Sequence, residues 1–414
     1  MVRLGCSTQS WRSWGWLASR DKWCRTRFHH LQPSCGGFRA PVAGTRQLGA
    51  TAARNPPHPW VSVYATTPSG RVPAVTLGLC SAASLWCSPG LTTPSGRIPA
   101  VPVTFEAMHP FRFGVQLRNA ADGQGWREKA RKAEDLGYST LFLADHFGDG
   151  WNPTVPLTVA AEVTSALKVG ALVYANDYRH PLLMARDIAT MDVMFPGRVE
   201  FGLGAGWMTT DYLESGIALD GPGTRIERMA EALEVITQLW TQEHVTFEGK
   251  HYTLNGARCV PRPVTAGGPS ITIGGGGRKV LSLAAHYAAI IGVNPELSSG
   301  VAGVEAAQTG VAARYTERIG WIRQAAGARF DDIELQLLVQ FEQVVPNRGE
   351  VFAGVAPLFS VTPEEAADMP IVLVGTVDEI CDDLVRRREQ FGFSYIVLHE
   401  MDAMAPVVAR LAGT

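Results

Sequence analysis

The sequence predicts an α/β fold in which eight parallel strands and their connecting helices close into a barrel, and three observations lead to it. From Phe111 onward, short apolar runs alternate with amphipathic segments. Strict alternation implies parallel strands, because each return to the same edge of a sheet needs a crossover helix. Eight such units in about 300 residues fit a (β/α)8, or TIM, barrel. An open doubly wound sheet is the second choice, but no G-x-G-x-x-G follows the first strand.

Each expected strand is a short apolar run that stops at glycine or at polar residues. In chain order, the eight strands are expected at 111–117, 139–145, 167–174, 198–206, 269–275, 288–294, 333–341 and 394–400. The stretch 245–254 reads as a hairpin that turns at Glu248-Gly249 and is inserted into the barrel order.

The helices are recognised by apolar residues that recur every three to four positions. The first, at 125–138, repeats alanine at this spacing and meets Gly137 as a stop signal. The others are expected at 155–166, 180–195, 224–240 and 278–287, within 304–326, and at 377–392. The run RRREQ at 386–390 lies on the last of these helices and is most simply a solvated face.

A leader of different composition precedes the barrel. Residues 1–104 carry 11 Lys and Arg but a single acid, Asp21, whereas the rest of the chain carries 26 basic and 38 acidic residues. The stretch TTPSGRVPAV at Thr66 returns as TTPSGRIPAV at Thr92, and no helical or strand period is sustained. Residues 1–107 are therefore expected to be a disordered or wrongly translated leader, or a targeting segment, and 108–414 the working domain. Five cysteines without C-x-x-C spacing lie in the leader: Cys6, Cys24, Cys35, Cys80 and Cys87.

The composition argues against several classes of function. A net charge of −2 gives no signal for nucleic-acid binding, and no run of 18 apolar residues predicts a membrane span. The body has only Cys259 and Cys381, which argues against a disulfide scaffold and for a cytoplasmic location. No H-E-x-x-H spacing predicts a metal, and no G-x-S-x-G predicts a hydrolase.

Polar and aromatic residues gather where the expected strands end, at the face that carries barrel active sites. The second strand runs into Asp145 and His146 and then a loop closed by Trp151. The fourth runs into GLGAGW, which ends at Trp207 and suits either a flat ring lying against bare backbone or simple crowding.

Four glycines, 274–277, join the fifth strand to its helix. Their N–H groups at a helix N-terminus favour a phosphate, with Arg278 or Lys279 adding charge. A flexible turn or tight strand–helix packing is the alternative.

Several of these stretches, in this order, resemble one known family. LGYSTLFLADHF, HPLLMARDIATMDVMFPGRVEFGLGAGW, PGTRIERMAEALEVITQLW and ITIGGGGRKVLSLAAHYA are similar to the luciferase-like monooxygenase superfamily, and most of all to its deazaflavin-dependent branch. The resemblance covers about 108–412. It implies a TIM barrel that binds FMN or the 8-hydroxy-5-deazaflavin coenzyme F-420, usually as a homodimer.

The resemblance also implies roles for individual residues. His146 would lie at the reacting face of the ring and exchange a proton with substrate, or else only shape the pocket. Asp145 would orient His146 or, more simply, cap the next segment. A non-proline cis peptide is implied near Ala171-Leu172. The remaining residues assigned to the cofactor are Gly204, Ala205, Gly206, Gly275, Gly276, Gly277 and Arg278. Trp151 and Trp207 would wall the substrate pocket, with plain packing equally open.

Three functions compete. A deazaflavin-dependent oxidoreductase would move hydride between coenzyme F-420 and a small organic substrate, and the Asp145-His146 pair favours it. An FMN-dependent monooxygenase would insert one oxygen atom from O2. A non-catalytic barrel would only bind flavin or a partner.

Overall fold

The computed structural model describes residues 109–148 and 150–414. The expectations for the leader at 1–107, including its five cysteines and its duplicated stretch, lie outside the described residues.

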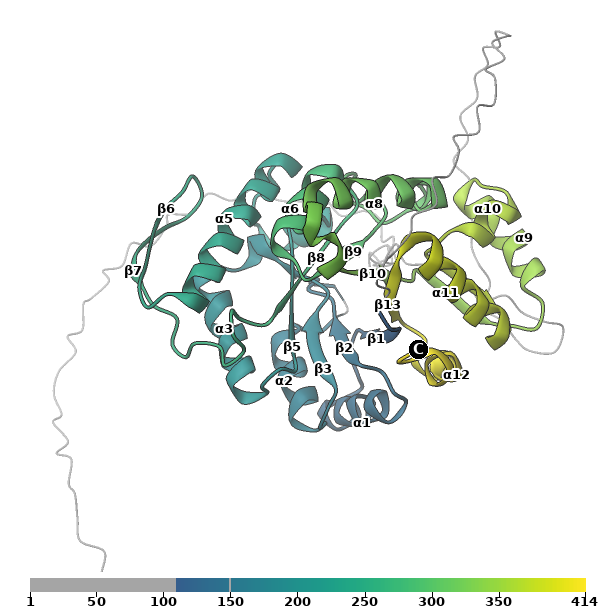
Figure 1. Ribbon diagram of the computed structural model, residues 1–414, viewed down its shortest axis with the longest axis horizontal. Coiled ribbons are helices and arrows are strands. Elements are labelled where there is room, and N and C mark those ends of the chain that lie inside the picture. Colours follow the sequence, from purple (N-terminus) through teal and green to yellow (C-terminus); the bar gives the residue numbers. More distant parts are fainter. Residues whose placement is uncertain (1–108, 149) are drawn as a thin grey trace, which may run out of the picture. The chain divides into compact units, whose positions relative to one another are not determined.

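Eight parallel strands close into a barrel in the described part of the chain (Figure 1). β1 pairs with both β2 and β13, and β3 pairs with β5, so the ring has no free edge. The strands are β1 (Arg112–Leu117), β2 (Thr140–Leu143), β3 (Lys168–Ala171), β5 (Val199–Gly204), β8 (Ser270–Gly275), β9 (Ile290–Val293), β10 (Glu334–Leu338) and β13 (Phe393–Leu398). The predicted barrel and all eight of its strands are confirmed.

Helices surround this ring, and local signals set their ends. Thr376 and Glu379 form a capping box at the start of α11, which ends at Gly392 with a φ of 80°. The surrounding helices are α1 (Gly123–Asp135), α2 (Thr154–Glu162), α3 (Pro181–Met194), α5 (Pro222–Thr241), α6 (Arg278–Tyr287), α8 (Ala312–Ala326), α11 (Val377–Phe391) and α12 (Met401–Leu411). Of these, α12 was not predicted.

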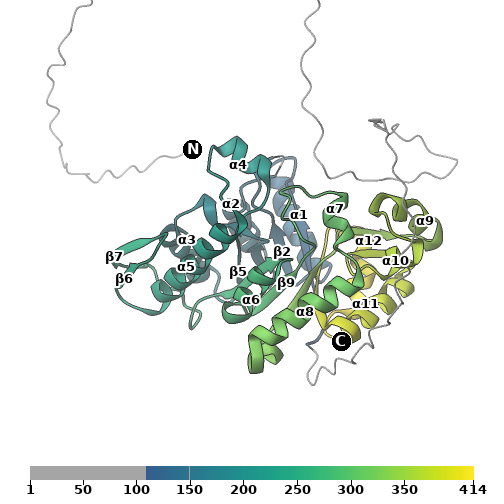
Figure 2. The same ribbon diagram turned by 90° about the horizontal axis from the view of Figure 1, so that it is seen from above.

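Two insertions extend the barrel, and Figures 1 and 2 place them at opposite ends of the described part. The predicted hairpin forms from β6 (Val245–Glu248) and β7 (Thr253–Ala257). The second insertion, which was not predicted, follows β10. It consists of β11 (Phe341–Val344), α9 (Arg348–Phe359), α10 (Pro363–Asp368) and β12 (Val372–Gly375), with β11 paired to β12.

Five short elements complete the described part. They are β4 (Tyr174–Ala175), η1 (Asn176–Tyr178), α4 (Thr209–Ser215), α7 (Val304–Gln308) and η2 (Gly327–Asp332).

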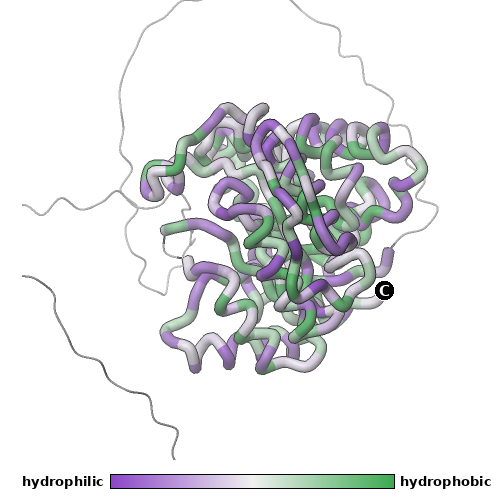
Figure 3. The backbone as a smooth tube through the Cα atoms, turned by 90° about the vertical axis from the view of Figure 1, so that its left-hand side faces the viewer, coloured by the Kyte–Doolittle hydropathy of each residue, from purple (hydrophilic) through white to green (hydrophobic). Residues whose placement is uncertain are grey.

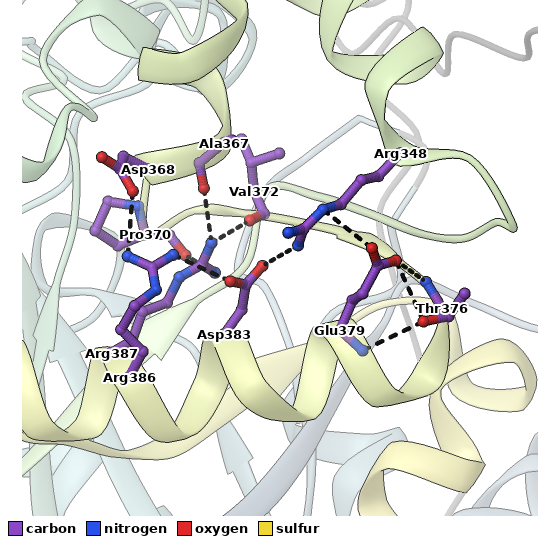
Figure 4. Close-up of polar contacts among 10 residues, drawn as sticks. All are labelled: Arg348, Ala367, Asp368, Pro370, Val372, Thr376, Glu379, Asp383, Arg386 and Arg387. Carbon is purple, nitrogen blue, oxygen red and sulfur yellow. Dashed lines mark hydrogen bonds and ion pairs between the residues drawn. The ribbon is translucent and has the colours of Figure 1, made fainter.

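The run RRREQ on α11 is solvated only in part, because Arg386, Glu389 and Gln390 are exposed but Arg387 is buried. Figure 4 shows the polar contacts of Arg386 and Arg387. Arg387 is 1% exposed and donates to the carbonyl oxygens of Pro370 at 2.9 Å and Val372 at 2.7 Å. Burial lowers its pKa to about 10. Arg386 pairs with Asp368 at 3.1 Å. Arg386 and Arg387 therefore attach the second insertion to helix α11 of the barrel. Their charge alone did not predict this role.

The barrel interior follows the alternation of side chains along each strand. Figure 3 shows hydrophobic stretches through the middle of the described part and hydrophilic residues recurring on the outer helices. The inward-facing apolar cluster contains Phe142, Ile290, Tyr395 and Val397, with Leu172 and Leu338 packed against it.

A polar floor, made of Arg112, Glu200, Glu334 and Tyr395, lies at the N-terminal ends of the strands. Arg112 reaches Glu200 and Glu334, each at 2.6 Å. The Tyr395 hydroxyl donates to Glu200 at 2.9 Å, and the Arg112 guanidinium stacks 3.5 Å from the Tyr395 ring centroid. The floor joins four strands through their side chains.

Glycine is required where β3 and β5 meet. A Cβ added at Gly202 would lie 2.1 Å from the carbonyl oxygen of Ala171, which is a backbone atom and not the end of a flexible side chain. Gly202→Ala is therefore expected to lower the free energy of unfolding by about 1–3 kcal/mol through overpacking. Chemical unfolding of the full chain measures this change.

The matched control is Gly320→Ala on α8, where an added Cβ meets no atom within 4 Å. It is expected to leave stability unchanged or to raise it by about 0.5–1 kcal/mol, because alanine favours a helix over glycine. Equal effects of the two substitutions would contradict the steric argument.

Candidate active site

His146 lies three residues beyond Leu143, the last residue of β2. Phe142 belongs to the inner cluster, whereas Leu141 and Leu143 pack outward under the helices. Asp145 and His146 lie beyond the strand, and their side chains bind different partners.

Asp145 does not orient His146, and it does not cap the segment that follows it. Its buried carboxylate accepts two hydrogen bonds from Arg179, one of them at 3.0 Å, and one from the N–H of Ala175 at 3.1 Å. The pair holds the connection between β3 and α3. A cofactor contact for Asp145 stays a prediction.

The hydrogen-bond partner of His146 is Asp211 on α4, a residue that was not predicted from the sequence. The His146 Nδ1 lies 2.6 Å from Asp211 Oδ2, and the carboxylate is 2% exposed. Tyr178 donates its hydroxyl to Oδ2 at 3.1 Å, and the N–H of Phe147 donates to Oδ1 at 3.3 Å. The Trp207 ring meets the imidazole edge-on, with centroids 5.5 Å apart.

Electrostatics favour an ionised carboxylate at Asp211. Burial opposes its ionisation, but the hydrogen bond and charge of His146 and the donors Phe147 and Tyr178 outweigh this and lower its pKa. The site therefore keeps a negative charge behind the imidazole ring.

The two tryptophans have different surroundings. Trp207 contacts His146, as a wall of the site would. The Trp151 ring instead lies 5.8 Å from that of Trp126 on α1 and packs against the core. Simple packing therefore accounts for Trp151.

The cis peptide joins Leu172 and Val173, one bond later than the expected Ala171-Leu172. The carbonyl oxygen of Leu172 accepts from Gln116 Nε2 at 3.1 Å. Val173 then lies over two glycines of β5, where an added Cβ would come 3.1 Å from it at Gly202 and 2.5 Å at Gly204. The non-proline cis peptide expected near Ala171-Leu172 is therefore present, at the next bond along the chain.

Crowding accounts for most of the GLGAG stretch. Gly204 makes room for Val173, and Gly206 has a φ of 75° with the Tyr212 hydroxyl 2.0 Å from where a Cβ would stand. Ala205 is half-buried and packs against the core. Contact of these three residues with a cofactor stays a prediction.

The glycine run also has packing reasons. A Cβ on Gly275 would come 2.3 Å from Val280 of α6, and one on Gly276 would come 2.4 Å from the carbonyl oxygen of Pro295. Gly277 is the N-cap of α6, and its nearest neighbour, Glu296 Oε1, lies 3.9 Å from the Cβ position. Room for a ligand is therefore greatest at Gly277.

Arg318 on α8 places a positive charge beside the glycine run 274–277, and the sequence did not predict this. Arg318 is 2% exposed and donates Nε to the carbonyl oxygen of Gly276 at 2.9 Å and Nη1 to that of Thr309 at 2.7 Å. Arg278 is exposed and donates instead to Gln324 at 3.2 Å.

The end of β13 carries a second polar cluster. The backbone N–H groups of His399 and Glu400 donate to Glu342 on β11, the first at 2.7 Å. Burial lowers the pKa of the His399 imidazole. Burial also raises the pKa of Glu342 to about 8, even though the two N–H donors oppose that shift.

Two searches of the described residues complete the survey. No group of three or more His, Cys, Asp or Glu among them is arranged to hold a metal ion. None of the helices in residues 109–148 and 150–414 is both long and apolar enough to span a membrane.

Comparison with known proteins identifies the family. The model of the luciferase-like monooxygenase family matches residues 103–329. A 4-hydroxyprotoasukamycin monooxygenase of Streptomyces nodosus subsp. asukaensis is 30% identical over 307 residues, which cover 67% of this chain and 81% of that protein.

An F-420-dependent glucose-6-phosphate dehydrogenase of Microbacterium testaceum is 30% identical over 206 residues, covering 45% of this chain and 59% of that protein. The chain thus spans only a little over half of this relative. The solved coenzyme F-420-dependent tetrahydromethanopterin reductase of Methanopyrus kandleri superposes with a TM-score of 0.59 at 19% identity, covering 73% of this chain and 99% of that one, which supports the fold. The chain therefore belongs to the luciferase-like monooxygenase family.

Proposed function

We propose that this chain is an oxidoreductase that transfers hydride between coenzyme F-420 and a small organic substrate. The observation that carries the proposal is the His146–Asp211 pair, with Nδ1 and Oδ2 2.6 Å apart. Hydride transfer from an alcohol, or to the corresponding carbonyl compound, also moves one proton, and an imidazole backed by a carboxylate suits that task. Relatives named for coenzyme F-420 support this choice of cofactor.

The glycine run fits the anionic part of such a coenzyme. The N–H groups of the first turn of α6 have no partner inside the helix, and the helix dipole favours negative charge there. Arg318 adds a positive charge next to Gly276, whereas Glu296 near Gly277 opposes an anion. The balance favours binding, with Gly275, Gly276 and Gly277 as the proposed cradle.

His146 handles the proton in this proposal. Its Nδ1 is engaged by Asp211, while its Nε2 makes no hydrogen bond with another described residue. As the C–H bond of an alcohol breaks and its electron pair leaves with the hydride, Nε2 accepts the hydroxyl proton and the carbonyl forms. Asp211 stabilises the resulting imidazolium. Trp207 limits the approach of water from its side of the ring. Bound coenzyme would supply the carbon that takes up or returns the hydride.

A second candidate is an FMN-dependent monooxygenase, which would insert one oxygen atom from O2. The monooxygenase relative, of which the chain covers 81%, favours it.

Cofactor titration of the full-length chain is expected to separate the two. Coenzyme F-420 should bind, and its absorbance should fall on reduction by an alcohol without oxygen uptake. FMN that binds and, once reduced, consumes oxygen with substrate would instead identify a monooxygenase. Binding of neither cofactor would overturn both proposals and leave a non-catalytic barrel.

We further propose a homodimer located in the cytoplasm. Four large apolar side chains of α2 and α3 are exposed, namely Val155 at 69%, Leu183 at 55%, Met194 at 53% and Val193 at 40%. Burying them against a second copy would remove apolar surface from water. Light scattering that gives the mass of a single chain would overturn the dimer.

The cytoplasmic location rests on the cysteines. Cys259 and Cys381 are both free and buried, which suits a reducing compartment.

A further inference from the structure

We propose that Asp211 is a positioning residue that holds His146 in the tautomer with the proton on Nδ1 and the lone pair on Nε2. This inference rests on the proposed function, because it assigns a task to the same site. A carboxylate only accepts hydrogen bonds. A neutral imidazole 2.6 Å from it must therefore present its N–H at Nδ1.

The carboxylate is held in place by its own neighbours. Oδ2 accepts from the Tyr178 hydroxyl at 3.1 Å, and Oδ1 accepts from the N–H of Phe147 at 3.3 Å. Each carboxylate oxygen therefore has its own donors, and these fix the orientation of the carboxylate so that Oδ2 faces His146. The lowered pKa of Asp211 keeps it ionised.

Helix α4, which carries Asp211, is anchored independently of His146. The Tyr212 hydroxyl donates to Asp177 Oδ2 at 2.9 Å, and Asp177 pairs with Arg228 at 2.9 Å. The N–H of Thr209 donates to the carbonyl oxygen of Gly300 at 3.1 Å. Loss of the Asp211 charge therefore leaves other contacts to hold the helix, and Tyr212→Phe provides a matched control for the anchoring.

Asp211→Asn should invert the tautomer. The N–H of Phe147 requires an acceptor at the Oδ1 position, so the amide oxygen would take that place. The amide NH2 then faces His146 and donates to Nδ1, which must carry the lone pair. The proton moves to Nε2, where it blocks proton acceptance from substrate.

The experiment measures the tautomer directly in the full-length chain. Long-range 1H–15N spectra of histidine-labelled protein at about pH 8.5, where free imidazoles are neutral, distinguish Nδ1–H from Nε2–H. The spectrum of His146→Gln identifies the His146 signals. We expect Nδ1–H in the wild type, Nε2–H in Asp211→Asn, and Nδ1–H in both Asp211→Glu and Tyr212→Phe.

Kinetics provide the second readout. In Asp211→Asn, kcat is expected to fall about 10²- to 10⁴-fold with little change in KM, as for loss of a general base. Asp211→Glu should recover part of the rate, and Tyr212→Phe should change it only a few-fold.

The outcomes separate this inference from the proposed function. An unchanged His146 tautomer in Asp211→Asn overturns it, as does an equal change in Tyr212→Phe. If the tautomer inverts but the wild type shows no reaction with coenzyme F-420, the positioning role stands and the proposed function fails.

Discussion

Arg112→Met is expected to lower the free energy of unfolding by about 3–5 kcal/mol. Arg112 is the main counter-charge of Glu200, whose side chain is 2% exposed. Without it, Glu200 keeps only the Tyr395 hydroxyl and the more distant Lys168, whose Nζ lies 3.7 Å away. A buried carboxylate that loses its partner is far more unfavourable than a pair removed whole. Chemical unfolding of the full chain measures the loss.

The control variant also removes the buried negative charge of Glu200. Arg112→Met combined with Glu200→Gln removes the carboxylate that the single change strands, so the double variant should be more stable than Arg112→Met alone. Adding Glu200→Gln alone and the wild type completes a double-mutant cycle, which gives the coupling energy of the pair. A loss below about 1 kcal/mol in Arg112→Met would show that solvent already screens the barrel floor.

Glu342→Gln is expected to raise stability at pH 9 by a few kcal/mol relative to the wild type and to change it little at pH 5. Burial raises the pKa of Glu342 from 4.5 to about 8. The unfolded chain therefore releases this proton at lower pH than the native chain does. The stability that the protonated Glu342 contributes is complete below pH 4.5 and is lost as the pH rises to about 8. Glutamine does not titrate, and its oxygen can accept the same two N–H groups.

Thermal unfolding of both proteins at pH 5, 7 and 9 tests this sign. Glu231→Gln is a control in which the pKa of the native carboxyl group is shifted in the opposite direction. Burial opposes ionisation of Glu231, but the N–H groups of His251, Lys250 and Tyr252 outweigh it and lower its pKa. That substitution should therefore weaken the fold at neutral pH. A constant difference between Glu342→Gln and the wild type at all three pH values would refute the prediction.

Local patterns in the sequence were enough to predict the barrel. Apolar runs that stop at glycine or at polar residues marked the eight strands, and recurrence every three to four residues marked most of the surrounding helices. The same patterns failed at α4 and in the second insertion. The seven residues of α4 are too few to show a helical period, and α9 contains Pro357, a residue type that usually breaks a helix. A threonine pair followed by an acid, at 209–211, was the available signal for the start of α4.

Local patterns could not predict which residues contact His146 and the glycine run. The sequence singled out His146 and expected its neighbour Asp145 to orient it or, more simply, to cap the next segment, but Asp145 binds Arg179. Likewise, the sequence pointed to Arg278 or Lys279 for charge next to the glycine run, but not to Arg318, which lies 42 residues from Gly276.

The sequence by itself determined the fold class, the order of the strands and the position of His146 at a strand end, because periodicity and turn residues act over a few neighbouring positions. Only the tertiary structure decided that Asp211, 65 residues away, backs the imidazole, and that Arg112 joins Glu200 and Glu334 at the floor. The physical reason is closure of the ring. It brings the ends of all eight strands together whatever their separation along the chain, and no local pattern encodes which side chains then meet.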